Sequence, residues 1–333
     1  MEAIGATGWK LCDPKGDLVF VITQSSAINN PPCGSNDSTS GANPVMRIAA
    51  SSKHVTLASP VLAAILSTNF AEGISLKANG FARIFLQDNP SAFAIIMDIV
   101  HARNNWVPLE VDLATLTNLA LIVDKYQMHN AISYFANIWI DNLKVKNDDK
   151  SVFGDMEVTL RWIAIAWVFQ NKEQFKKHTG IAKNMASGAL LRAEKMNQLI
   201  YELPLPDNLI EDMCTFYQNS MAHLVDTYSY MISRLGHDGV IICPNSREDC
   251  DSMILGYLIR KGQAFGLFPE PAPPFGELRL GEILRKMKAV KPKKTCKSSH
   301  GGMNHGVSEM FEAAVGRVEK DMEGWELRHY LRA

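Results

Sequence analysis

The chain has 333 residues, of which 47% are hydrophobic, and this length allows a substantial buried core divided between two domains. The 34 lysines and arginines nearly balance the 35 aspartates and glutamates, so the net charge of −1 gives no general attraction to nucleic acid or anionic lipid. The N-terminal residues MEAIGATGWK lack a secretory pattern, and no apolar run reaches the roughly 20 residues of a membrane-spanning helix. Six scattered cysteines fit reduced thiols or a metal site better than a disulfide framework. We therefore expect an intracellular protein of the cytoplasm, the nucleus or both, without membrane contact.

The first half of the chain predicts a small β-sheet. After a tail at residues 1–12, the apolar run Asp17–Thr23 predicts a buried strand, and Met46–Ala49 predicts its return strand. Residues 24–44, between these strands, are rich in Ser, Asn, Gly and Pro and predict a disordered insertion. The segment Ala82–Gln87 alternates, which predicts a third strand with Ile84 and Leu86 pointing inward.

Helices are expected around this sheet. Ser59 followed by Pro60, and Asn89 followed by Pro90, are each typical of a helix start, because the first residue caps the helix and proline fits its first turn. Asp112 predicts the cap of a third helix. A fourth helix is indicated by apolar residues at helical spacing: Ile132, Phe135, Trp139 and Leu143.

A charged stretch, Lys144–Lys150, predicts a linker, and the rest of the chain predicts mostly helix. The expected helices are Met156–Gln170, Asp207–Leu235, Asp249–Phe265, Gly276–Val290 and Gly306–Met322. The predicted fold class is therefore α+β, with an N-terminal domain at residues 13–143 and a mainly α-helical C-terminal domain at residues 151–333.

Three segments follow one another through the first half: SSKHVTLASPVLAAILSTNFAEG, ARIFLQDNPSAFAIIMDIVHARN and DLATLTNLALIVDKYQMHNAISYFANIWIDNL. Together they resemble a BTB/POZ domain of the divergent fungal type. The resemblance is most specific at Ser59–Val61, at the pair Phe70 and Glu72, and at Val123–Met128. The second half, including LRWIAIAWVFQNKEQF, is similar to the helical tail of the same fungal proteins. The chain departs from the family at Leu62, where Phe is usual, in its long insertion, and in having no zinc-finger or kelch repeats after the domain.

The resemblance implies a protein-binding module, which in other members supports homodimerisation, co-regulator binding or docking to a cullin scaffold. We therefore expect a non-enzymatic scaffold or adaptor, with a cullin-type ubiquitin ligase as one candidate assembly. One alternative is a nuclear regulator that recruits co-regulators through the same domain, and another is a zinc-stabilised structural protein. The sequence has none of the common nucleotide-binding or hydrolase motifs, and His54, His101 and His129 have no nucleophile at readable spacing, so we interpret them as structural.

One group of residues has the chemistry of a metal site. Thiolates and imidazoles are the usual zinc ligands, and they are supplied here by Cys243, Cys250, Cys296, His300 and His305. The interval of six residues between the first two cysteines is longer than the usual two to four. Both a structural zinc ion and free thiols with surface histidines therefore remain open.

A basic run lies near this group. Clustered cations of this kind are found in nuclear-import signals and in nucleic-acid contacts, but the run has no interleaved aromatic residues. We prefer its interpretation as a solvated helix end and loop, and nucleic acid is not an expected partner. The run comprises Arg285, Lys286, Lys288, Lys291, Lys293, Lys294 and Lys297.

Overall fold

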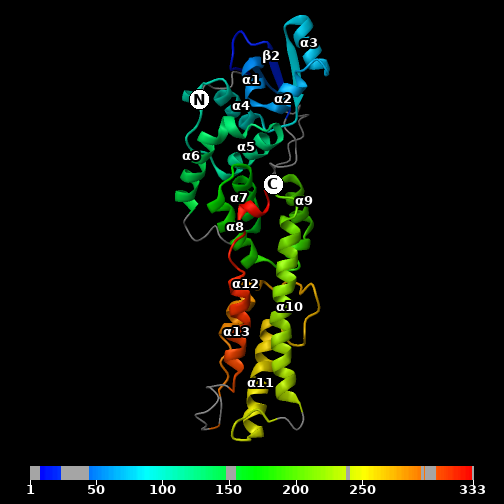
Figure 1. Cartoon of the computed structure of the whole chain (residues 1–333), viewed down its shortest axis with the longest axis vertical. Helices are drawn as coiled ribbons and strands as arrows, with labels where there is room; N and C mark the ends of the chain where they lie inside the picture. The colour runs from blue at the N-terminus through cyan, green and yellow to red at the C-terminus, as the bar shows by residue number, and fades with distance from the viewer. Residues whose placement is uncertain are drawn as a thin grey trace, which may run out of the picture. The chain divides into compact units, whose positions relative to one another are not determined.

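The computed structural model describes residues 8–23, 45–147, 155–237, 241–293, 296 and 305–331 (Figure 1). The chain divides into two compact units, the first made of residues 1–150 and 164–171 and the second of residues 151–163 and 172–333. The first unit contains a four-stranded sheet with helices, and the second is helical, which confirms the predicted α+β class. The expected insertion at 24–44 lies outside the described residues.

The sheet of the first unit has the strand order β1-β3-β2-β4. Strands β2 (Leu18–Thr23) and β3 (Val45–Ala50) pair antiparallel, and β4 (Ala82–Leu86) pairs parallel to β2. The alternation predicted for β4 is confirmed, because Ile84 and Leu86 are buried while Arg83 and Phe85 are exposed.

The predicted N-terminal tail is wrong for Trp9–Leu11, which forms strand β1 and pairs parallel to β3. A three-residue strand has little pattern of its own, and a long-range ion pair anchors this one. The Lys10 ammonium lies 2.5 Å from a carboxylate oxygen of Asp98, a buried residue that also pairs with Arg103 at 3.3 Å. Residues 1–7 lie outside the described part of the chain.

Helices of the first unit begin where the caps were predicted. Helices α2 (Pro60–Ile65), α4 (Pro90–Val100) and α5 (Leu113–Tyr126) are capped by the side chains of Ser59, Asn89 and Asp112. Two short helices, α1 (Ser52–Ala58) and α3 (Ala71–Asn79), were not predicted. Helix α6 (His129–Asn147) includes the first four residues of the predicted linker, and residues 148–150 lie outside the described chain.

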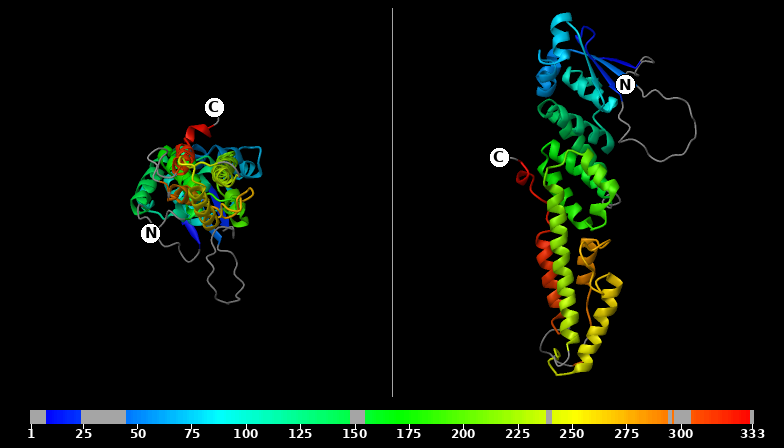
Figure 2. Two further views of the ribbon diagram at one scale, coloured as in Figure 1. Left: turned by 90° about the horizontal axis from the view of Figure 1, so that it is seen from below. Right: turned by 90° about the vertical axis from the view of Figure 1, so that its right-hand side faces the viewer.

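Helix α7 (Met156–Val168) contributes its residues up to Ile163 to the second unit and the rest to the first. The second unit continues with α8 (Lys172–Met185), α9 (Glu194–Glu202), α10 (Leu209–Gly236), α11 (Glu248–Phe265), α12 (Leu280–Lys288) and α13 (Val307–Lys320). Figure 2 shows α11 and α13 packed along the long helix α10. Helices α8 and α9 were not predicted, and α12 is shorter than expected.

Tyr228 joins three helices at the centre of this packing. Its ring stacks on Phe311 of α13 with 5.2 Å between centroids, and its hydroxyl donates to the carbonyl of Leu258 on α11 at 2.8 Å. Gly262 lets α11 approach closely, because a Cβ at this position would lie 2.9 Å from the Tyr228 ring. Tyr228 therefore links the three helices at this level of the bundle.

Candidate metal centre

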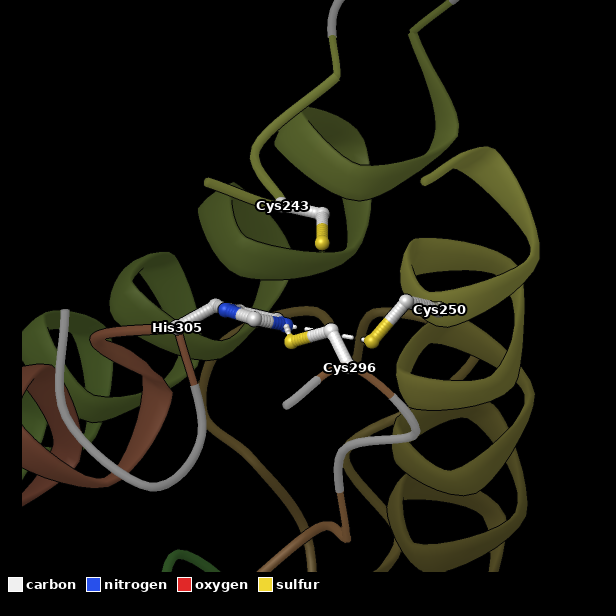
Figure 3. Close-up of side chains that lie close together, drawn as sticks. All are labelled: Cys243, Cys250, Cys296 and His305. Atoms are coloured by element: carbon white, nitrogen blue, oxygen red, sulfur yellow. Dashed lines mark hydrogen bonds between the residues drawn. The ribbon is translucent and has the colours of Figure 1, made fainter. Parts of the chain in front are cut away.

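Two loops and one helix start bring together a cluster of sulfur and imidazole groups in the second unit (Figure 3). Cys243 lies in the connection from α10 to α11, and Cys250 lies in the first turn of α11. Cys296 lies between α12 and α13, and His305 comes just before the first residue of α13. Residues far apart in the sequence therefore meet at the ends of three packed helices.

The four ligand atoms lie within 4.8 Å of one another. His305 Nε2 is 3.1 Å from the sulfur of Cys250 and 3.5 Å from the sulfur of Cys296. A tetrahedral zinc ion, with arms of about 2.3 Å to sulfur and about 2.0 Å to nitrogen, separates such ligands by about 3.5 Å. The measured spacing is thus close to that of a zinc coordination shell.

The cluster is shielded from solvent. Cys250 is fully buried, and Cys243, Cys296 and His305 are 4%, 5% and 7% exposed, so water has little access to the ligand atoms. His305 has a left-handed backbone, with φ at 54°, and Gly306 follows at 80°. This tight turn allows the imidazole to face the cysteines while the chain enters α13.

The ligand types indicate which metal ion the cluster would bind. Soft thiolates with one imidazole are typical ligands of zinc, and four protein ligands close the coordination shell, as in structural zinc sites. The other ring nitrogen, His305 Nδ1, is buried without a hydrogen-bond partner among the described residues. Because Nε2 faces the sulfurs, Nδ1 is the nitrogen that carries the proton when the ring acts as a ligand. The residues therefore fit a structural zinc ion.

A buried carboxylate, which was not predicted from the sequence, contacts the backbone of Cys243. Asp251 is 4% exposed, and its Oδ2 accepts hydrogen bonds from the backbone N–H groups of Ile242 at 2.6 Å and Cys243 at 3.1 Å. Acidic residues are common in a first helical turn, so Asp251 did not stand out from its neighbours in the sequence. Its position directly after Cys250 was the only available signal.

No family model, curated protein or solved structure matches the chain. Within the ranges described above, no helix is both long and apolar enough to cross a membrane.

The described members of the basic run do not form a common site. His300, Lys294 and Lys297 lie outside the described residues. Within the basic run, Lys286 pairs with Glu282 at 2.7 Å and Lys288 pairs with Glu319 at 2.6 Å. The remaining described members, Arg285, Lys291 and Lys293, are exposed.

The N-terminal histidines have packing partners instead of catalytic ones. His101 accepts a hydrogen bond from the Ser51 backbone N–H at 2.9 Å, and its other nitrogen lies 2.8 Å from the Met97 carbonyl. Its ring stacks on His54, and burial lowers the pKa of His101. His129 lies 4.0 Å from Asp124 at the surface. His101 therefore serves to hold the start of α1 near the end of α4.

Proposed function

We propose that the chain is a non-enzymatic scaffold or adaptor, which binds other proteins through a BTB/POZ-type first unit and is stabilised by zinc in its second unit. The β2–β3 hairpin, helices α1 and α2, strand β4 and helices α4 to α6 follow in the order that the sequence resemblance implies. This order supports the fold assignment. Function needs a separate argument from the surface, because a fold by itself does not define a partner.

The outer face of the sheet is the proposed binding surface. Strand register places Trp9, Arg47, Val21 and Phe85 in one row across β1, β3, β2 and β4. Phe85 is 74% exposed and Trp9 is 42% exposed, although large apolar side chains usually stabilise a fold by being buried. In the right-hand view of Figure 2, helices of this unit gather on one side of the blue strands. The row therefore offers aromatic side chains of the kind enriched in protein interfaces.

Charge on the same face indicates the chemistry of the partner. Arg47 lies over the Trp9 ring at 5.8 Å, and Arg83 neighbours Phe85 on β4. Neither arginine has an ion-pair partner within the described ranges. A partner segment with apolar side chains and carboxylates would cover the aromatic groups and pair with both guanidinium groups.

Zinc has a structural part in this proposal. An ion held by Cys243, Cys250, Cys296 and His305 would cross-link the ends of α10, α11 and α13. A shell closed by four protein ligands leaves no position for substrate, which favours a structural role over catalysis. Zinc thus supports the helical unit, while the sheet face provides the binding surface.

A nuclear regulator is the second candidate, supported by the exposed basic residues Arg285, Lys291 and Lys293. It would use the same sheet face to recruit co-regulators, so the two candidates differ in their partners and not in their binding surface. A cullin among the partners would indicate an adaptor for ubiquitin ligation, whereas nuclear co-regulators would indicate a regulator.

The test compares two exposed aromatic residues of the first unit. Tagged full-length wild type, Phe85→Asp and Tyr134→Asp proteins are recovered from native cells, and their co-purifying proteins are quantified. Tyr134 on α6 is 71% exposed, so it matches Phe85 in exposure but lies on a helix. We expect partners that are retained by Tyr134→Asp and lost by Phe85→Asp, with unchanged circular dichroism and melting temperature. Equal recovery by all three folded proteins would reject the sheet face as the binding surface.

A further inference from the structure

The interval between Cys243 and Cys250 poses a geometric problem for a metal site. Short cysteine knuckles place both sulfurs through a tight backbone turn, but here six residues intervene. A turn exists at the start of the interval, where the Ser246 N–H donates to the Cys243 carbonyl at 2.8 Å. Helix α11 then begins at Glu248 and fixes Cys250. The turn orients the chain after Cys243, so the approach to Cys243 needs another restraint.

Asp251 supplies that restraint. Its carboxylate projects from the first turn of α11 and accepts from two successive backbone N–H groups, those of Ile242 and Cys243. The same turn that carries one ligand, Cys250, thereby holds the backbone of another ligand. Both ligands are then positioned by a single rigid element, which compensates for the long interval between them.

The burial of Asp251 argues against an incidental role. A carboxylate that is 4% exposed has lost most of its hydration, which is costly unless hydrogen bonds replace the water. Its second oxygen, Oδ1, is buried and has no hydrogen-bond partner among the described residues. The nearby Asp249 differs, because it is exposed and pairs with Arg247 in the same turn. An exposed acid such as Asp249 is sufficient to stabilise the start of a helix, so the burial of Asp251 needs another explanation.

We infer that Asp251 is a positioning residue for the metal centre, which orients Cys243 by holding its backbone N–H. This inference rests on the proposed zinc ion. Outer-shell groups of this kind commonly change metal affinity by about 10–100-fold when they are removed. Asp251 acts through the backbone of Cys243 and does not itself belong to the cluster of ligand atoms.

The experiment measures zinc affinity by competition with a chelator of known affinity in full-length wild type, Asp251→Leu, Asp251→Asn and Glu248→Gln proteins. Leucine removes both hydrogen bonds, so we expect zinc binding about 10–100-fold weaker than in wild type. Asparagine keeps an oxygen that can accept both hydrogen bonds, so the loss of zinc affinity should be smaller and should reflect the removed negative charge. Glu248→Gln is the matched control, because it removes an exposed carboxylate from the same helical turn, and its zinc affinity should be unchanged.

A second measurement separates positioning from general stability. The melting temperature of each protein is recorded with zinc and after its removal, together with the absorption spectrum of the cobalt-substituted form. A positioning role predicts that Asp251→Leu reduces the increase in melting temperature caused by zinc, while cobalt still shows tetrahedral thiolate ligation. Wild-type zinc affinity in Asp251→Leu, or an equal loss of stability with and without zinc, would overturn the role of Asp251. Absence of zinc binding by wild type would instead refute the metal centre itself.

Discussion

Removing zinc from the proposed centre should destabilise the second unit by the free energy of zinc binding. The four ligands come together only in the folded chain, so zinc stabilises the fold by about 4 kcal/mol when free zinc is about 1,000 times its dissociation constant. For a unit of this size, each kcal/mol corresponds to about 2–4 °C in melting temperature. We therefore expect the transition of the second unit to fall by about 8–16 °C when zinc is removed.

Differential scanning calorimetry of the full-length protein, before and after chelation, measures this shift. Cys296→Ser should melt at the chelated temperature and should not respond to chelator. Cys214→Ser is the matched control, because Cys214 lies on α10 outside the cluster and is partly exposed. Zinc binding by thiols releases protons, so the chelator-sensitive part of the stability should shrink as the pH falls. An unchanged melting temperature after complete zinc removal would refute this argument. So would a zinc-loaded Cys214→Ser protein that melts as low as Cys296→Ser.

Three further predictions concern groups away from the metal. Ser59→Ala should lower the free energy of unfolding by about 2–4 kcal/mol, because the buried hydroxyl both accepts from the Leu62 N–H and donates to the Tyr126 carbonyl at 2.6 Å. In the same urea-unfolding assay, Asn89→Ala should lose only about 1 kcal/mol, because Asn89 acts as a cap alone. Burial lowers the pKa of His178 to about 3, below its usual 6.5, so stability should fall by up to about 5 kcal/mol as the pH drops through this window, whereas urea unfolding of His178→Phe should lack that component. Burial also lowers the pKa of Lys183 to about 8 from 10.5, so wild type should gain at most about 3 kcal/mol relative to Lys183→Met as the pH rises from 8 to 10.5, and a flat difference across that range would contradict this assignment. The gain for Lys183 is an upper bound, because its ammonium lies 4.2 Å from the Trp325 ring centre, which favours the charged form.

The parts of the fold that could be predicted are those that local chemistry decides. The caps at Ser59, Asn89 and Asp112 act within one helical turn, so they are visible in a few consecutive residues. The alternation of β4 follows in the same way from a sheet with one buried face.

The elements that escaped prediction depend on distant partners. Strand β1 is only three residues long, and its pairing with β3 and its ion pair with Asp98 are long-range contacts. Helix α8 buries polar side chains, including Gln174, His178 and Lys183, so its inward face does not have an apolar pattern. Hydrophobic periodicity indicates a helix only when its buried face is apolar.

The metal centre was predictable in its residue types but not in its membership. The cysteine and histidine residue types suggested zinc although their spacing was irregular, and the structure places four of the five candidates together, while His300 lies outside the described residues. The choice among loop histidines depends on where the chain turns into α13, which spacing does not specify. Asp251 was missed for a related reason, because its role becomes visible only when the backbone of Cys243 is placed beside it.

The two ends of α13 are held by different kinds of contact. At the C-terminal end, Lys183 donates to the carbonyls of Asp321 and Glu323, and Trp325 donates from its backbone to Thr179 at 2.9 Å. Aromatic rings surround this contact, so ordinary packing and hydrogen bonds hold that end.

At the N-terminal end of α13, the buried cluster consists of the three cysteines, with the imidazole of His305 against them. Three cysteine side chains bury much less apolar area than aromatic or leucine side chains, so hydrophobic burial within this cluster contributes little stability. A metal ion compensates for a small core, because its binding free energy becomes folding free energy. The zinc proposed for this centre would therefore stabilise the loops that precede α11 and α13, next to the apolar packing of Val307 and Phe311.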